Sequence, residues 1–207
     1  MQGPGPRCSR LAHWVGRSWL AAFGWRIEGQ VPPVAKGVFI AAPHTSNWDM
    51  PHMLAVAWTL GFRVSWMGKS AMFRWPFGGF MRWLGGIPID RSKRGNMVER
   101  VAEQFARAPA LYLVIPVSGT RSRTEYWKSG FYHIARAAEV PIACTFLDYA
   151  RMAGGVGLVI EATGNLSADM DRLREFYSGV QAKWPELTSR VRLVEEDQGA
   201  SRTGTSA

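Results

Sequence analysis

Short apolar runs rich in Val, Ile and Phe alternate along this chain with segments whose apolar residues recur at the helical period. Strands and helices that alternate in this way pack in layers, so the pattern predicts a single α/β domain with a mixed, mostly parallel sheet flanked by helices. Strands are expected at residues 37–42, 62–67, 86–89, 111–115, 141–147 and 157–162. Helices are expected at residues 10–25, 47–60, 95–108, 130–138 and 168–183.

Length and composition fit one domain with distinct ends. A chain of 207 residues is long enough for one full core, and 47% hydrophobic with 20% charged residues excludes a disordered or fibrous protein. We expect an amphipathic membrane-associating segment at 1–28, the α/β domain at 29–194 and a disordered tail at 195–207.

Charge and tryptophan content indicate the class of partner. A net charge of +9 favours an anionic partner, which could be nucleic acid, an anionic bilayer or a phosphorylated substrate. Ten Trp favour the bilayer, because the indole ring concentrates between lipid headgroups and acyl chains. The chain has no recognisable nucleic-acid-binding module, and its charges are interleaved with Trp and Met, so we expect no nucleic acid partner.

Two segments are candidates for membrane contact. The helix expected at 10–25 carries an apolar stripe flanked by Arg10, Arg17 and Arg26, as in a helix lying in a bilayer interface, although a helix packed on its own domain fits equally well. The segment at 66–84 interleaves Trp, Phe and Met with basic residues. No apolar run approaches the roughly 20 residues of a spanning helix, so we expect a monotopic protein on the cytoplasmic face of the cell membrane. The expected contact residues are Trp14, Trp19, Trp66, Phe73, Trp75, Phe77 and Trp83.

His44 and Asp49 are the candidate catalytic residues. His44 follows the strand expected at 37–42, and a helix capped by Ser46 or Asn47 would place Asp49 in its first turn, close to the imidazole. A carboxylate there fixes the tautomer of the ring and leaves its other nitrogen free to act as a general base. The spacing alone is also explained by Asp49 as an N-terminal helix charge.

Other chemistries lack their motifs. The chain contains neither G-x-S-x-G nor H-E-x-x-H, and Gly68-Lys69-Ser70 has Arg63 where a phosphate loop requires glycine. Cys8 and Cys144 have no paired spacing, so neither a disulfide framework nor a metal site is indicated. A His-Asp pair without its own nucleophile implies direct attack by a substrate hydroxyl, with no metal or prosthetic cofactor.

Three further blocks follow the H-x4-D motif: GGIPIDR at 85–91, GTRS at 119–122 and VPI at 140–142. In this order and spacing, from about residue 37 to 185, the four blocks resemble the lysophospholipid and glycerol-phosphate acyltransferase family, which includes 1-acylglycerol-3-phosphate acyltransferase. The resemblance implies that His44 is the general base and Asp49 its orienting charge. It also implies that Arg91 and the third block, Gly119, Thr120, Arg121 and Ser122, contact the phosphate of the acceptor.

The chemistry of these side chains agrees with that implication. Arginine presents a planar fork that matches phosphate oxygens, and a Gly-Thr turn offers backbone amides to the same anion. Lys128 would add a point charge nearby, although a solvated surface charge is the simpler interpretation of that residue.

One position departs from the family pattern. The third block of the family reads E-G-T, whereas Ser118 precedes Gly119 and Thr120 here. Serine offers a shorter, neutral hydrogen bond, which predicts an altered acceptor, a slow enzyme or a non-catalytic lipid-binding relative.

The resemblance as a whole implies an O-acyltransferase of phospholipid synthesis. It would move a fatty acyl group from acyl-CoA or acyl carrier protein to a hydroxyl of a lysophospholipid-like acceptor, with 1-acylglycerol-3-phosphate as the expected acceptor and membrane lipids as its surroundings.

Overall fold

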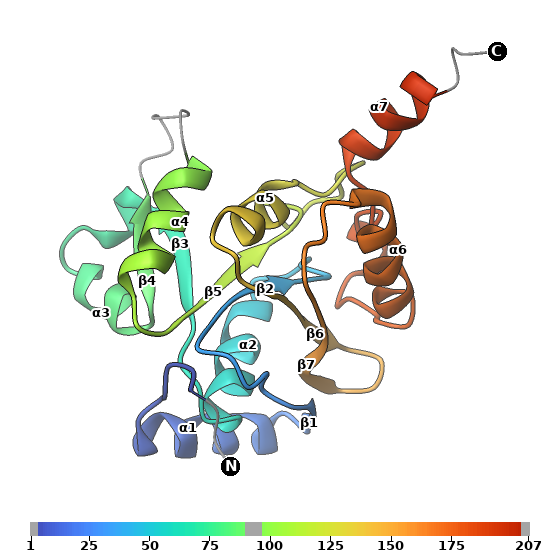
Figure 1. Cartoon of the computed structure of the whole chain (residues 1–207). Helices are drawn as coiled ribbons and strands as arrows, with labels where there is room; N and C mark the ends of the chain where they lie inside the picture. Colours follow the sequence, from blue (N-terminus) through green and yellow to red (C-terminus); the bar gives the residue numbers. More distant parts are fainter. Residues whose placement is uncertain (1–3, 90–96, 204–207) are drawn as a thin grey trace.

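The sheet has seven strands in the order β1-β7-β6-β2-β5-β3-β4 in this computed structural model, which describes residues 4–89 and 97–203 (Figure 1). Neighbouring strands are parallel except β6 and β7, which are antiparallel. The predicted mixed, mostly parallel sheet is confirmed. The strands are β1 Arg26–Gly29, β2 Lys36–Ala41, β3 Ser65–Lys69, β4 Gly86–Ile89, β5 Leu111–Pro116, β6 Ile142–Asp148 and β7 Ala153–Ile160.

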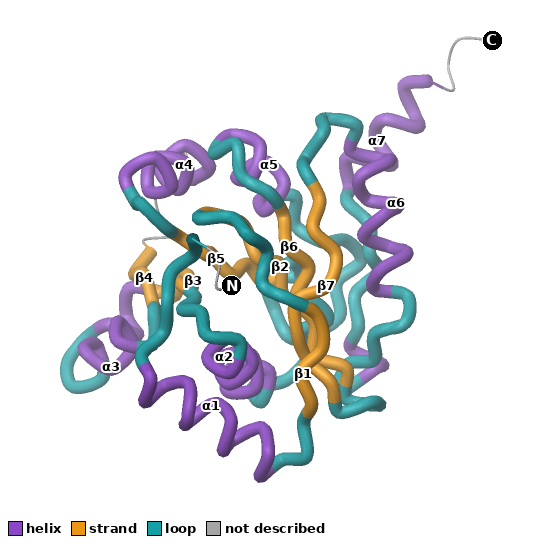
Figure 2. The backbone as a smooth tube through the Cα atoms, turned by 60° about the horizontal axis from the view of Figure 1, so that its bottom comes forward, coloured by secondary structure: helices purple, strands orange, loops and turns teal. Residues whose placement is uncertain are grey.

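Helices cover both faces of this sheet (Figure 2). They are α1 Arg10–Ala22, α2 Asp49–Thr59, α3 Gly78–Trp83, α4 Met97–Arg107, α5 Gly130–Ala137, α6 Leu166–Tyr177 and α7 Val194–Thr203, with short 3-10 helices at Ser70–Phe73 and Pro185–Leu187. Among the described residues, none of these helices combines the length and apolar character needed to cross a bilayer.

The alternation of side chains along β2 and β5 explains why their sequences are continuously apolar. In β2, Val38 and Ile40 pack in the core under α4, α5 and α6, whereas Phe39 packs on the other face under α2. In β5, Leu113 packs in the core under α4, α5 and α6, and Tyr112 packs in the core under α2. A strand with both faces buried has no polar side to alternate with.

Helix α1 packs on α2 through its inner face. A Cβ added at Gly16 would lie 2.7 Å from the Ala55 carbonyl oxygen, so glycine permits this close approach. Leu20 and Trp25 are buried against α2 and β6. β1 follows at Arg26–Gly29 and pairs with β7 as an edge strand of the sheet.

The C-terminal segment differs from the prediction. Residues 194–203 form α7, not an irregular tail. Its first turn is acidic and is held by partners distant in sequence: Ser129 donates to Glu195, and Arg174 forms an ion pair with Glu196 at 2.9 Å. Acidic residues also favour the N-terminal end of a helix, so this polar segment is helical without an apolar stripe.

Candidate active site

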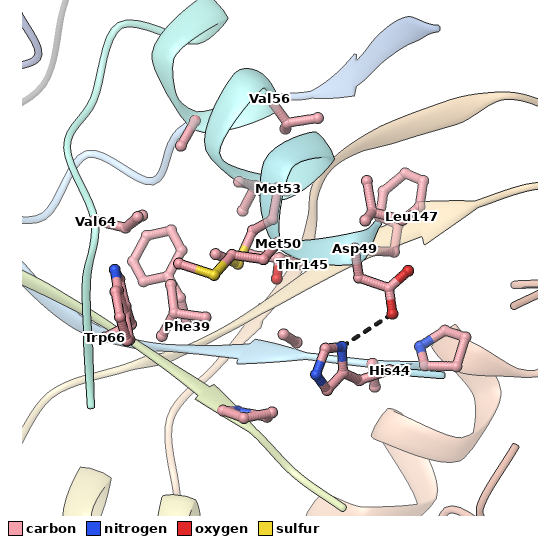
Figure 3. A pocket seen from close by; sticks show the side chains of 18 of the residues that line it. Phe39, His44, Asp49, Met50, Met53, Val56, Val64, Trp66, Thr145 and Leu147 are labelled. Carbon is pink, nitrogen blue, oxygen red and sulfur yellow. Dashed lines mark hydrogen bonds and ion pairs between the residues drawn. The ribbon is translucent and has the colours of Figure 1, made fainter. Parts of the chain in front are cut away.

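His44 and Asp49 are brought together at the carboxyl end of β2 (Figure 3). β2 ends at Ala41, α2 begins at Asp49, and the intervening loop carries the imidazole back over the first turn of the helix. The His44 Nδ1 and the Asp49 Oδ2 are 2.9 Å apart. Asp49 is only 5% exposed, whereas His44 is partly accessible.

The loop that holds the pair is organised around the carboxylate, and this differs from the predicted helix cap. Neither Ser46 nor Asn47 caps α2, because Trp48 occupies the capping position and makes no side-chain cap bond. Instead the backbone N–H groups of Thr45 and Ser46 each donate to Asp49 Oδ2 at 2.9 Å. A carboxylate in the first turn therefore satisfies the backbone groups that precede it.

Tyr149 completes the hydrogen bonding of Asp49. Its hydroxyl donates to Asp49 Oδ1 at 2.7 Å, and burial together with this carboxylate raises the pKa of Tyr149. Burial alone would raise the pKa of Asp49, but hydrogen bonds from His44, Ser46 and Tyr149 outweigh it and hold that pKa below its usual value.

Asp49 is therefore ionised at neutral pH and only accepts hydrogen bonds. The Nδ1 of His44 must then be the donor in their hydrogen bond, which leaves the lone pair on Nε2. In Figure 3 this second nitrogen lies on the side of the ring away from Asp49. The arrangement suits a general base.

An apolar cavity of about 450 Å³ adjoins this pair. It lies between α2 and the face of the sheet that α2 covers, with Met50 and Met53 on the helix side (Figure 3). Exposed lining residues, Arg121 and Met72, mark where the cavity meets solvent. Its further apolar lining includes Phe39, Val56, Phe62, Val64, Trp66, Val114, Phe146, Leu147 and Val156.

Of the residues expected to contact the acceptor phosphate, those of the third block lie in one turn near the cavity. Arg91 falls outside the described residues. Gly119, Thr120 and Ser122 form an exposed turn after β5, and Arg121 of this turn lines the cavity that contains His44.

Lys128 lies across the same turn. Gly119 has a φ of 66°, which favours glycine, and a Cβ on it would lie 2.8 Å from the Lys128 Nζ, so the lysine side chain lies close against this turn. The backbone N–H of Lys128 also donates to the Val117 carbonyl oxygen at 2.8 Å. Within the described part of the chain, neither Arg121 nor Lys128 forms an ion pair, which leaves both cations available to an anion.

Ser118 is buried and directs its hydroxyl into its own turn. The Oγ donates to the Thr120 carbonyl oxygen at 2.6 Å. The side chain that replaces the acidic residue of the family thus stabilises the turn.

The expected membrane-contact residues fall into two groups. Trp14, Trp75, Phe77 and Trp83 are exposed, and Trp75 reaches 93%. Trp19 is half-buried, and its Nε1 donates to His52 Nδ1 at 3.1 Å.

Trp66 and Phe73, which were also expected to contact the membrane, are only 9% and 6% exposed. The two rings pack together with centroids 5.9 Å apart, and the Trp66 Nε1 donates to the Leu84 carbonyl oxygen. Trp66 contributes instead to the wall of the cavity.

Tyr149 was not among the predicted site residues, although its position contained a signal. It directly follows β6, which is parallel to β2, so both strands end at the same edge of the sheet. Side chains that follow parallel strands meet at that edge, which is where α/β proteins bind ligands.

An α/β domain with a partly accessible His44 bonded to a buried Asp49 beside an apolar cavity is consistent with an acyl-transfer enzyme, and comparison of the sequence with family models agrees. The chain belongs to the acyltransferase family, whose model matches residues 25–147, more than half of its length. Comparison with curated proteins finds no match.

The fold is similar to that of the 1-acyl-sn-glycerophosphate (LPA) acyltransferase PlsC from Thermotoga maritima, with a TM-score of 0.58. The similarity covers 84% of this chain and 81% of that chain at 15% sequence identity, and at this identity it concerns the fold alone.

The substitution Asp49→Asn tests the charge of the buried carboxylate. We expect it to lower the free energy of unfolding by about 1–3 kcal/mol at pH 7, because hydrogen bonds to a charged acceptor are lost. The pKa of Asp49 is depressed in the folded state, so its stabilisation is complete above the usual carboxyl pKa and is lost as the pH falls through the folded value. Urea unfolding from pH 7 to about pH 3 should show the difference narrowing below about pH 4. Exposed Asp171→Asn is the control, and a constant difference for Asp49→Asn would contradict the assignment.

Proposed function

We propose that this protein transfers a fatty acyl group from a thioester donor, acyl-CoA or acyl carrier protein, to a hydroxyl of a lysophospholipid-like acceptor. The observation that carries the proposal is the position of His44, which lines an apolar cavity of about 450 Å³ and is hydrogen-bonded through its Nδ1 to Asp49. A general base beside a cavity of this size and character suits a substrate that joins a hydroxyl to a long apolar chain.

In the proposed reaction the Nε2 of His44 takes the proton of the acceptor hydroxyl while the oxygen attacks the thioester carbonyl carbon. The tetrahedral intermediate collapses, the carbon–sulfur bond breaks, and the thiolate takes up the proton from the imidazolium. Asp49 stabilises the imidazolium, as a buried carboxylate does in hydrolase triads, and no acyl-enzyme forms.

The cavity is the proposed site of a fatty acyl chain. Its lining is mostly aliphatic, aromatic and thioether side chains, and the hydroxyl of Thr145 is already bonded to the Ile40 carbonyl oxygen. Each methylene that enters such a site gains about 0.8 kcal/mol. Met50 and Met53 can adjust to the chain because methionine is unbranched and flexible.

Arg121 is the proposed contact of the acceptor phosphate. Arg121 lines the same cavity as His44, so one acceptor molecule can meet both. Lys128, across the turn at Gly119, supports the phosphate as a point charge, and Arg91 joins them by family resemblance.

A second candidate is transfer to a different acceptor, or lipid binding without transfer. The hydroxyl of Ser118 donates to the Thr120 carbonyl oxygen, and serine has no carboxylate that could orient the hydroxyls of an acceptor. The mechanism at His44 is common to both acceptor classes.

We propose further that the protein binds the cytoplasmic membrane surface as a monotopic protein through exposed apolar residues of α1 and of residues 72–83. The two parts are neighbours: Trp58 contacts Trp83 of α3 with ring centroids 5.9 Å apart, and its carbonyl oxygen lies 3.1 Å from the Nδ1 of His13 on α1. Both parts carry exposed basic residues, Arg10 and Arg17 on α1 and Arg74 and Arg82 within residues 72–83, which suit anionic headgroups. The exposed residues are Leu11, Trp14, Val15, Phe23, Met72, Trp75, Phe77, Phe80 and Trp83.

Acyl transfer is tested with labelled acyl-CoA or acyl carrier protein and a panel of lysolipids. We expect His44→Ala to lower kcat about 100- to 10,000-fold, since the hydroxyl loses its general base. Product that forms at the parental rate in His44→Ala would defeat the mechanism.

The role of Arg121 is tested with two acceptors that differ only in the phosphate. For a phosphorylated lysolipid, Arg121→Gln should raise KM about ten- to a hundredfold, because charge-assisted hydrogen bonds are lost. For monoacylglycerol it should leave KM unchanged. Arg123→Gln, exposed in the same loop but outside the cavity lining, is the matched control. Equal effects of the two substitutions, or on the two acceptors, would contradict a phosphate contact.

Membrane binding is tested by sedimentation with vesicles of phosphatidylcholine and phosphatidylglycerol. The double substitution Trp75→Ser and Phe77→Ser should weaken partitioning about tenfold or more, since transfer of each ring from water into the bilayer is favourable by about 1.5–3 kcal/mol. Trp184→Ser, which removes an exposed Trp from another part of the molecule, is the control. Partitioning that is equal in both variants would refute the proposed surface.

A further inference from the structure

We infer that Tyr149 is a positioning residue for Asp49, and that it fixes the rotation and charge of the carboxylate on which His44 depends. The inference rests on the acyl transfer proposed above. It is carried by one contact, the hydrogen bond from the Tyr149 hydroxyl to Asp49 Oδ1 at 2.7 Å.

The two oxygens of Asp49 are held in different ways. Oδ2 accepts from His44 Nδ1 and from the backbone N–H groups of Thr45 and Ser46, all at 2.9 Å. Among the described residues, Tyr149 is the donor to Oδ1 and no other group reaches that oxygen. Without it, a buried oxygen with negative charge has no partner, and the carboxylate can rotate away from the imidazole.

Tyr149 is itself held rigidly enough to position another group. Its backbone N–H donates to the Gln181 carbonyl oxygen at 2.9 Å, and its ring meets Trp25 edge-on with centroids 4.9 Å apart. The Lys183 Nζ lies 5.7 Å from the ring centroid. Tyr149 is therefore constrained by two segments distant in sequence, at Trp25 and at residues 181–183, and its hydroxyl is aimed before substrate binds.

The other titratable groups around Tyr149 interact elsewhere, so its hydroxyl donates to Asp49 alone. His52 on α2 faces its ring at 6.0 Å, and burial, aided by Lys183, lowers the pKa of His52. His52 is neutral at pH 7, and its Nδ1 accepts from Trp19 Nε1. Lys183 contacts the aromatic faces of Trp48 and Tyr149, and His44 lies beyond Asp49.

The test is Tyr149→Phe, which removes the hydroxyl and keeps the ring. Its matched control is Tyr132→Phe, because Tyr132 also donates to a buried carboxylate, Asp169, at 2.7 Å and lines neither part of the proposed site. For acyl transfer, kcat should fall about ten- to a hundredfold in Tyr149→Phe with little change in KM, and should stay near the parental value in Tyr132→Phe.

A pH profile separates positioning from general destabilisation. A carboxylate that loses a hydrogen-bond donor binds protons more strongly, whether the proton sits on Asp49 or is shared with the imidazole of His44. The acid limb of the pH–rate profile should therefore move to higher pH in Tyr149→Phe and not in Tyr132→Phe. The carboxyl ¹³C resonance of Asp49, assigned by its loss in Asp49→Asn, should titrate at higher pH in the same variant, with or without substrate.

The outcomes distinguish this inference from the proposed function. Absence of transfer in the parent refutes acyl transfer, and equal rates of transfer in the parent and His44→Ala refute the role of His44 as the base. In either case the titration of Asp49 still tests the role of Tyr149. An active parent with an unmoved acid limb and an unmoved Asp49 titration in Tyr149→Phe overturns the inference. Equal losses in Tyr149→Phe and Tyr132→Phe overturn it as well, since both then reflect only stability.

Discussion

The structure around the site depends on the burial of one carboxylate. Asp49 lies where a charge is costly, and it is stabilised because His44, Thr45, Ser46 and Tyr149 all donate to it. Those donors come from the β2–α2 loop and from the end of β6, so the same four bonds that offset desolvation also fix the loop, the first turn of α2 and the turn after β6 relative to one another. The orientation of the imidazole follows from this arrangement.

The parallel sheet explains why the remaining groups converge. β2 is paired with β5 on one side and with β6 on the other, all three in the same direction. His44, Arg121 and Tyr149 each follow one of these strands, so they meet at one edge although about a hundred residues separate the first from the last. The face of the same strands under α2 supplies the apolar wall of the cavity.

Sequence patterns predicted the features that local periodicity determines. The layered α/β class, most helices and the pairing of His44 with Asp49 follow from apolar periods and from the strand-loop-helix order. Periodicity does not say which of two similar apolar rings is covered: Phe73 and Phe77 stand four residues apart in one aromatic segment, yet Phe73 is buried against Trp66 and Phe77 is exposed. β1, whose sequence is RIEG, carries two charged residues and no apolar run, and α7 depends on distant partners such as Arg174.

Burial of Trp66 also changes how the proposed membrane surface relates to the proposed chemistry. Trp66 and Met72 line the cavity, and Met72 is itself exposed, a few residues before Trp75 and Phe77. Met72 therefore belongs both to the lining of the cavity and to the exposed part of this segment. If an acyl chain enters from a bilayer as proposed, Met72 at the exposed rim of the cavity offers it an apolar contact there. The aromatic segment then serves both proposals at once: its outer residues contact lipid, and its inner residues form the wall beside which the thioester carbonyl reaches the base.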